Sequence, residues 1–123
     1  MLLLMQVQAL VWVGTRTNEY AATFAFFRDV LGLDVHTAET DFGVLEVPGG
    51  ATVEVFGPTS PYNEHLTHPV AGFLVSSLAE AVAELQAAGA EIVLPVQRGG
   101  PRSWMHFRAP DGFVYELVED STR

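Results

Sequence analysis

The sequence predicts an α+β domain built from two consecutive β-α-β-β-β modules. The chief observation is an internal repeat, because identical residues recur at a separation of 62 positions: Val13 and Val75, Pro48 and Pro110, Gly50 and Gly112, Glu54 and Glu116. Both halves also end on P-x-G-x-x-x-E, as PGGATVE (48–54) and PDGFVYE (110–116). Fixed-period similarity indicates a repeated architecture. We therefore expect one domain over 1–123, with module one at about 6–57, a linker at 58–69 and module two at about 70–119.

Module one opens with an expected strand over 7–13, in which Val7, Ala9, Val11 and Val13 alternate with Gln8, Leu10 and Trp12. The aliphatic side should lie under a helix, so Gln8, Leu10 and Trp12 should face the other way. Residues 15–18 are expected to form a turn. Residues 44–47 and 52–56 are expected to form a hairpin around Pro48-Gly49-Gly50.

The helix of module one is expected to run through Val30, capped by Thr17 or Asn18. Gly32 should end it, as glycine does after many helices. The i, i+3/i+4 spacing predicts a buried stripe of four residues: Tyr20, Phe24, Phe27 and Leu31.

Module two repeats the pattern after a linker rich in proline and polar residues. A strand is expected over 70–75 and a helix after Ser76 or Ser77, with Leu78, Val82 and Leu85 buried and Gly89 at its end. The remaining expected elements are a strand at 91–96, a loop at 98–101, and a closing pair at 104–108 and 113–118 around Pro110-Asp111-Gly112.

Composition restricts the classes of partner and compartment. The chain has 123 residues, no cysteine, six arginines, no lysine and a net charge of −9. Such a balance disfavours nucleic acid, whose binding requires neutralised phosphates. No apolar run is long enough to span a membrane, and residues 1–5, read as a lead-in to the first strand, have no basic segment typical of a secretory signal. We expect a cytoplasmic protein with neither nucleic-acid nor membrane partners.

Two motifs carry a resemblance to a known family. FFRDVLGL (26–33) and RAPDGFVYEL (108–117), together with the duplication, resemble the vicinal oxygen chelate superfamily, also called the glyoxalase/bleomycin-resistance/dioxygenase family. The resemblance covers about residues 6–119. It implies paired modules that curl around a cavity, commonly completed in a homodimer that binds a small molecule.

The resemblance also implies positions for metal ligands. Members similar to glyoxalase I take one ligand from the first and one from the last strand of each module, which corresponds here to Gln8, Glu54, Val70 and Glu116. Three of these offer oxygen donors, suited to Mg²⁺, Mn²⁺ or Ni²⁺, with Zn²⁺ also open. Valine has no donor atom, and His68, two residues earlier, is an alternative. Glu116 and Glu54 could also act as catalytic bases.

Two functions remain open. The first is a dimeric protein that binds a small molecule and has an incomplete metal site, similar to the bleomycin-resistance branch. Aromatic and polar side chains would line its ligand pocket: Trp12, Phe56, Trp104 and His106. The alternative is a metal-dependent lyase or isomerase similar to glyoxalase I, acting through an enediolate. Whether the protein is an enzyme is left open. A protein without a cofactor is favoured over one that holds a divalent metal ion.

Overall fold

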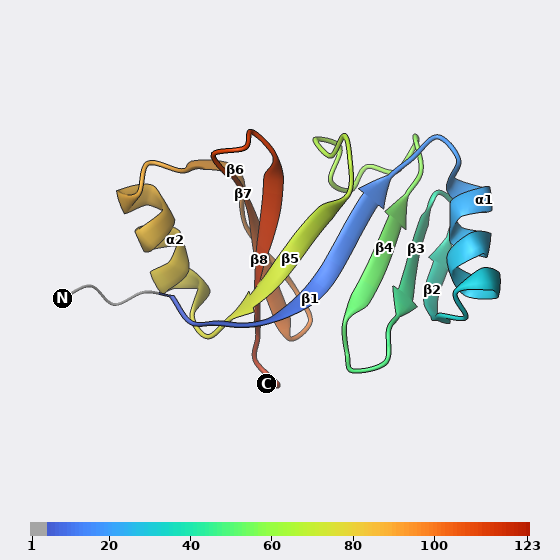
Figure 1. Ribbon diagram of the computed structural model, residues 1–123, viewed down its shortest axis with the longest axis horizontal. Helices are drawn as coiled ribbons and strands as arrows, with labels where there is room; N and C mark the ends of the chain where they lie inside the picture. Colours follow the sequence, from blue (N-terminus) through green and yellow to red (C-terminus); the bar gives the residue numbers. More distant parts are fainter. Residues whose placement is uncertain (1–4) are drawn as a thin grey trace. The chain divides into compact units, whose positions relative to one another are not determined.

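The computed structural model describes residues 5–123, which form eight strands and two α-helices in two consecutive β-α-β-β-β units (Figure 1). The α+β class and the two β-α-β-β-β units predicted from the sequence are confirmed. The described chain divides into two compact bodies. Body one is Val11–Ala71, and body two is Gly72–Arg123 together with residues 5–10. The first and fifth strands each cross this boundary and are described below with the body that holds most of their residues. The strand lead-in expected at residues 1–5 lies, for residues 1–4, outside the described part.

Body one is a four-stranded sheet with one helix against it (Figure 1). The strand order is β2-β3-β4-β1, with β1 parallel to β4 and the other neighbours antiparallel. Its elements are β1 (Val7–Arg16), α1 (Tyr20–Ala25), β2 (Asp34–Glu39), β3 (Phe42–Glu46) and β4 (Thr52–Phe56). β1 continues to Arg16, so the expected turn at 15–18 begins later than predicted. The hairpin of β3 and β4 is confirmed, and Gly49 and Gly50 have φ values of +100° and +101° at its turn.

The core of body one lies between α1 and one face of this sheet. Phe24, Leu45 and Val55 are buried there, and four residues pack around them: Tyr20, Phe27, Leu33 and Val53. Gly43 allows the close contact, because a Cβ atom at that position would lie 2.2 Å from the Phe24 ring. The sheet face that carries Val53 and Val55 is therefore the helix-covered face.

The end of the first helix differs from the prediction. After Ala25 the chain continues as η1 (Phe26–Val30), a π-helical segment in which the Leu31 N–H donates to the Phe26 carbonyl at 3.1 Å. A π turn holds more residues than an α turn, so it rotates the side chains that follow. Leu31, expected in the buried stripe, is consequently 55% exposed, and Leu33 packs on the core instead. Gly32 follows with φ +72°, as predicted.

The start of α1 also differs from the expectation. Neither Thr17 nor Asn18 is the N-cap, because the helix begins at Tyr20 and Glu19 precedes it. Thr17 instead accepts a hydrogen bond at Oγ1 from the Glu19 N–H at 2.9 Å. The hydroxyl thus stabilises the turn before the helix rather than the free N–H groups of its first turn.

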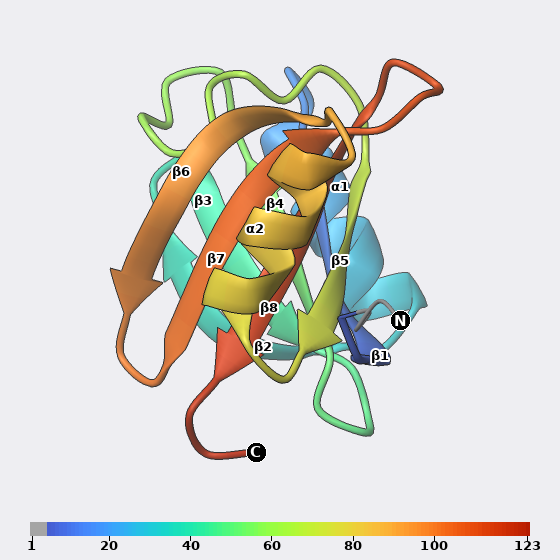
Figure 2. The same ribbon diagram turned by 90° about the vertical axis from the view of Figure 1, so that its left-hand side faces the viewer.

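Body two has the same architecture, with strand order β5-β8-β7-β6 and β5 parallel to β8. Figure 2 shows α2 lying against this sheet. Its elements are β5 (Val70–Val75), α2 (Leu78–Ala87), β6 (Glu91–Gly99), β7 (Arg102–Arg108) and β8 (Val114–Asp120). β6 extends through two residues of the expected loop at 98–101, so the turn is confined to Gly100 and Pro101.

The cap and core of α2 follow the sequence closely. Ser77 is the N-cap, and its Oγ accepts from the Glu80 N–H at 3.2 Å, while the Leu78 N–H donates to Glu119 Oε1 at 2.7 Å. Gly89 ends the helix with φ +82°. The buried core comprises Val75, Leu78, Ala81, Met105 and Leu117, and Val82 and Leu85 pack on it as predicted. Within residues 5–123 no helix has both the length and the apolar character needed to cross a bilayer.

Candidate functional site

In each body, alternation along the strands gives the sheet a second face, opposite the helix, which we call the helix-free face. In body one this face carries Trp12, Arg16, Phe42, Glu54 and Phe56, because their neighbours Val53 and Val55 point toward α1. In body two it carries Trp104, His106, Glu116 and Val118, because Met105 and Leu117 point toward α2. Most of the site residues predicted from the sequence lie on these two faces.

Glu54 and Glu116 occupy equivalent positions in the two bodies. Glu54 on β4 is aligned with Gly14 on the parallel strand β1, and Glu116 on β8 is aligned with Gly72 on the parallel strand β5. In both cases a glycine stands beside the carboxyl group, so no neighbouring side chain arises from that position. The duplication seen in the sequence therefore extends to the pairing register of the two acidic residues.

The indole ring of Trp12 fills the space above Gly14. A Cβ atom at Gly14 would lie 2.1 Å from Cη2 of Trp12 and 2.3 Å from Cζ2, so only glycine permits this ring position. Trp12 is buried, with 4% of its surface exposed. The ring lies over the residue aligned with Glu54, which brings an aromatic side chain beside that half-buried carboxyl group.

A second aromatic group lies one residue pair further along the same face. Arg16, Phe56 and Phe42 are aligned across β1, β4 and β3. The ring centroids of Phe42 and Phe56 are 5.4 Å apart, and those of Phe42 and Tyr62 are 5.1 Å apart. We call Phe42, Phe56 and Tyr62 the aromatic cluster. Phe56 is buried, whereas Tyr62 is 52% exposed.

Body two contains a buried pair of polar side chains on its helix-free face. His106 on β7 is aligned with Glu116 on β8, and Nε2 of the histidine lies 2.9 Å from Oε1 of the glutamate. Neither residue is accessible to more than a trace of solvent, with exposed fractions of 0% and 4%. His106, predicted from the sequence to line a ligand pocket, is in direct contact with the Glu116 carboxyl group.

Burial favours the neutral forms of both partners. It lowers the pKa of His106 from 6.5 to about 4 and raises the pKa of Glu116 well above its ordinary 4.5. With both groups neutral, the carboxyl hydroxyl donates to Nε2 of the imidazole. The pair therefore holds one proton on the acid, in a place where neither member carries a net charge.

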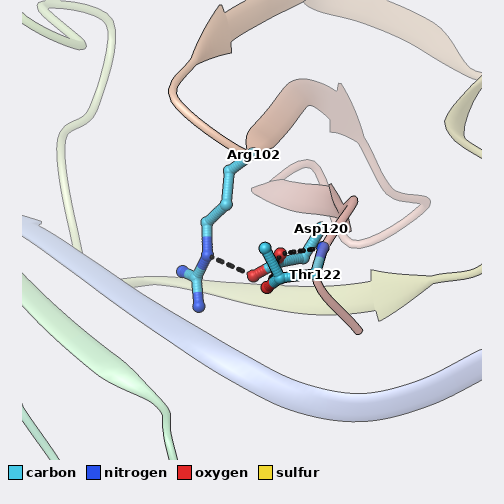
Figure 3. A network of polar contacts seen from close by, with 3 residues as sticks. All are labelled: Arg102, Asp120 and Thr122. Carbon is cyan, nitrogen blue, oxygen red and sulfur yellow. Dashed lines mark hydrogen bonds and ion pairs between the residues drawn. The ribbon is translucent and has the colours of Figure 1, made fainter.

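The same face of body two carries a partly buried ion pair. The Nε of Arg102 donates to Oδ2 of Asp120 at 3.1 Å, and the backbone and hydroxyl of Thr122 donate to Oδ1 at 2.9 and 2.6 Å (Figure 3). These hydrogen bonds lower the pKa of Asp120. The positive charge of Arg102 also lowers the pKa of Glu116, but by less than burial raises it.

Trp104 lies between Arg102 and His106 on this face of β7. It is half-buried, and its Cη2 atom would lie 2.9 Å from a Cβ atom at Gly99, so its ring extends toward the β6–β7 turn. The aromatic residues predicted to line a ligand pocket, Trp12, Phe56 and Trp104, therefore all stand on helix-free faces.

The residues predicted as metal ligands fit a metal centre poorly. Val70 is buried and offers no donor, and Oε1 of Glu116 is engaged by His106. Gln8 is exposed, and the ring of His68 contacts Thr67 Oγ1 through Nδ1 at 2.9 Å. Among residues 5–123 no three or more histidine, cysteine, aspartate or glutamate side chains are grouped as a metal ion requires. The assignment of Gln8, Glu54 and Glu116 as ligands stays a prediction.

Sequence reasoning did not predict the contacts of three charged residues: Arg16 and Asp41 with the linker, and Arg102 with Asp120. Arg16 and Asp41 both contact the linker, and only the folded chain brings those segments together. Arg102 could have been anticipated, because it and Asp120 are at matching positions of a hairpin centred on the PDG turn.

Comparisons with solved structures agree on the fold. The Mn(II)-bound glyoxalase from Novosphingobium aromaticivorans has a TM-score of 0.76 at 20% identity, covering 96% of this chain and 40% of that protein. Methylmalonyl-CoA epimerase from Mycobacterium tuberculosis has a TM-score of 0.70 at 22% identity, covering 98% and 93%. A glyoxalase/bleomycin resistance protein/dioxygenase superfamily member from Vibrio splendidus 12B01 has 0.67 at 20%, covering 94% and 99%.

At these identities the similarity establishes the fold and not the activity. A search of curated proteins finds no match to this chain. The family model of the glyoxalase/bleomycin resistance protein/dioxygenase superfamily matches residues 9–117, which is most of the chain. The chain therefore belongs to the glyoxalase/bleomycin resistance protein/dioxygenase superfamily.

Proposed function

We propose that this protein binds a small organic molecule with a planar aromatic group and does so without a metal ion. We further propose that it works as a cytoplasmic homodimer, the assembly expected from its family. In body one, Trp12 and Phe56 on the helix-free face would contact the ligand, and Glu54 would attract a positive charge on it. In body two, Trp104 and His106 are the proposed ligand contacts on the corresponding face.

The observation that carries the proposal is the hydrogen bond between His106 and Glu116. A carboxyl group binds a metal ion in its deprotonated form. Glu116 is instead buried against an imidazole at 2.9 Å, and burial raises its pKa. The fourth ligand position is a valine. These features support recognition of a ligand by polar and aromatic contacts rather than chelation of substrate oxygens.

The aromatic residues support the class of ligand. Trp12 lies over Gly14 beside Glu54, and the aromatic cluster follows on the same face. An aromatic ring next to a carboxylate attracts a flat cation by stacking and by cation–π interaction, worth about 0.5 to 2 kcal/mol per contact. The net charge of −9 favours the approach of such a ligand.

Metal content gives the first test. Protein purified without chelator, then loaded with Ni²⁺, Mn²⁺, Mg²⁺ or Zn²⁺ and freed of excess ion, would be analysed by inductively coupled plasma mass spectrometry. We expect well below one ion per chain, with no difference between the unaltered protein and Glu116→Ala. A stoichiometric ion that is lost in Glu116→Ala would overturn the proposal. That result would favour the metal-dependent lyase or isomerase, with Glu116 or Glu54 moving the substrate proton.

Calorimetric titration gives the second test, with ethidium as a planar cation and phenanthridine as its uncharged counterpart. We expect ethidium to bind more tightly. The chain has two tryptophans, so Trp12→Phe and Trp104→Phe separate the fluorescence responses of the two bodies. Lack of binding by both compounds at millimolar concentration would argue against an aromatic ligand. Glu54→Gln is expected to reduce the preference for the cation without changing phenanthridine binding.

A further inference from the structure

One arginine, Arg16, binds three carbonyl groups of the turn 57–62, where β4 leads into the linker. Nη1 of Arg16 donates to the Gly57 carbonyl at 2.7 Å, and Nη2 donates to the carbonyls of Ser60 and Tyr62 at 2.8 and 2.7 Å. The Nε atom of Arg16 is buried. Three acceptors from one turn of chain are thus held by one planar cation, which a lysine ammonium group could not reproduce in the same geometry.

Asp41 holds the same turn from the other side. It occupies the tip of the β2–β3 hairpin with φ +59°, a conformation that aspartate and asparagine tolerate better than most residues. Its Oδ2 accepts from the N–H of Thr59 at 2.8 Å and also from the Thr59 hydroxyl. Its carbonyl accepts from the Gly57 N–H at 2.7 Å.

Glycine is required where the linker leaves β4. A Cβ atom at Gly57 would lie 2.5 Å from Cγ of Asp41, so a larger residue would displace the hairpin tip. The hydrogen bonds from Thr59 lower the pKa of Asp41, and the positive charge of Arg16 adds to this effect. Arg16 and Asp41 therefore carry opposite charges on the two sides of the linker turn.

This clamp fixes the position of Tyr62. The Tyr62 carbonyl is bound by Arg16, and its N–H donates to Oγ of the buried Ser60 at 3.3 Å. The phenol ring consequently lies 5.1 Å from Phe42, with half of its surface exposed. Of the three rings in the aromatic cluster, it is the one that offers most surface to a ligand, because Phe56 is buried and Phe42 is half-buried.

We propose that Arg16 and Asp41 are positioning residues that clamp the linker turn 57–62, and that the clamped Tyr62 ring selects the planar group of the ligand. The ligand role of Tyr62 rests on the proposed function, whereas the clamp does not. The occupant is the aromatic ring of a small molecule, because a ring held in place in advance binds another ring with a smaller loss of conformational entropy. Glu54, on the same face, complements a positive charge on that molecule.

Amide hydrogen exchange tests the clamp without a ligand. The informative amides are those of Gly57, Thr59 and Ser60, whose acceptors lie in Asp41 or in the turn itself. We expect Arg16→Lys to raise their exchange rates at least tenfold while the core of body one stays protected. Arg98→Lys is the matched control, because Arg98 is exposed and contacts only Ser103 within the described residues. Unchanged exchange in Arg16→Lys would overturn the clamp.

Asp41 provides a second variant that keeps the turn conformation. Asp41→Gly retains access to positive φ but removes the acceptor for Thr59, and we expect exchange at Thr59 to rise as in Arg16→Lys. Asp41→Asn keeps an acceptor oxygen and should exchange more slowly than Asp41→Gly. Equal exchange in the unaltered protein and in Asp41→Gly would show that the carboxylate does not hold the turn.

Titration with ethidium tests Tyr62. We expect Tyr62→Ala to weaken binding about tenfold, Tyr62→Phe to bind normally, and Arg16→Lys to weaken binding without adding to the effect of Tyr62→Ala. Normal binding by Tyr62→Ala would overturn the role of the ring, even if the clamp is intact. Absence of binding by the unaltered protein would overturn the proposed function and the ligand contact together, and the exchange result would still decide the clamp.

Discussion

Replacement of Glu116 by glutamine should change the pH dependence of stability on both sides of pH 6.5. The buried pair of His106 and Glu116 carries one proton in the folded state, on the acid. In the unfolded state the glutamate titrates near 4.5 and the histidine near 6.5. Arg102 is the charged group that influences Glu116 across this face, and its positive charge lowers the pKa of Glu116 by less than burial raises it.

The sign follows from the number of protons in each state. Between pH 4.5 and 6.5 the unfolded pair also holds one proton, on the histidine, so the pair contributes no slope. Above pH 6.5 the unfolded pair holds none, because its histidine is then neutral. The unfolding free energy should therefore decrease by about 1.4 kcal/mol for each pH unit above 6.5, until the pH passes the raised pKa of Glu116.

Glu116→Gln removes the acidic proton but keeps a donor for Nε2 of His106. Only the histidine then titrates, and its pKa is lowered from 6.5 to about 4 by burial. The contribution of His106 to the stability of the variant is fully present above pH 6.5 and is lost as the pH falls through about 4. The total loss corresponds to about 3.5 kcal/mol, from a pKa lowered by about 2.5 at 1.4 kcal/mol per pH unit.

Urea unfolding at intervals from pH 4 to pH 9 measures both curves. The difference between variant and unaltered protein cancels the contributions of all other groups. We expect the unfolding free energy of the variant to rise relative to that of the unaltered protein as the pH increases above 6.5. As the pH decreases below 6.5, we expect it to fall relative to that of the unaltered protein. Parallel curves above pH 6.5 would refute the reasoning, because they would mean that Glu116 is ionised in the folded state. The imidazole nitrogen signals of His106 should, in addition, stay those of a neutral ring down to about pH 5.

Two further predictions concern packing. Leu45→Ala should cost about 2 to 5 kcal/mol of unfolding free energy because Leu45 is fully buried against α1. Leu31→Ala, the same substitution at a 55% exposed position, should cost less than about 0.5 kcal/mol. Similar costs for the two variants in urea unfolding would contradict the core assignment. Gly14→Ala should cost about 1 to 3 kcal/mol and shift the tryptophan emission, because its Cβ atom overlaps the Trp12 ring. In a Trp12→Ala background the same change should cost little, and an undiminished cost there would mean that the indole is not the obstacle.

The elements of the fold could largely be read from the sequence because local chemistry sets them. Ser77 caps α2, Gly32 and Gly89 follow the helices with positive φ, and the two P-x-G motifs mark tight turns between strands. The main error was at Leu31. The 3.6-residue period predicts it on the buried side, but the π-helical segment from Phe26 to Val30 rotates it outward. A single extra residue in a turn leaves no signal in an i, i+4 pattern.

The candidate site could be predicted only in part. Strand alternation was sufficient to assign Trp12 to the face opposite the helix, whereas Glu54 and Glu116 were assigned from the family resemblance and from their equivalent places in the repeat. It could not supply the partner of a side chain, because that depends on the register between strands. The contact of His106 with Glu116 follows from the β7–β8 register and from burial, which together favour a neutral pair.

By itself, the sequence determined the duplicated β-α-β-β-β plan, the family, and the face of the first strand on which Trp12 stands, because periodicity, turn residues and motifs are local properties of the chain. Only the tertiary structure decided the contacts made across long intervals. Arg16 and the linker carbonyls are more than 40 residues apart, and no pattern in the sequence connects them. The same holds for the protonation of Glu116, because its pKa depends on the desolvation that packing around β8 produces.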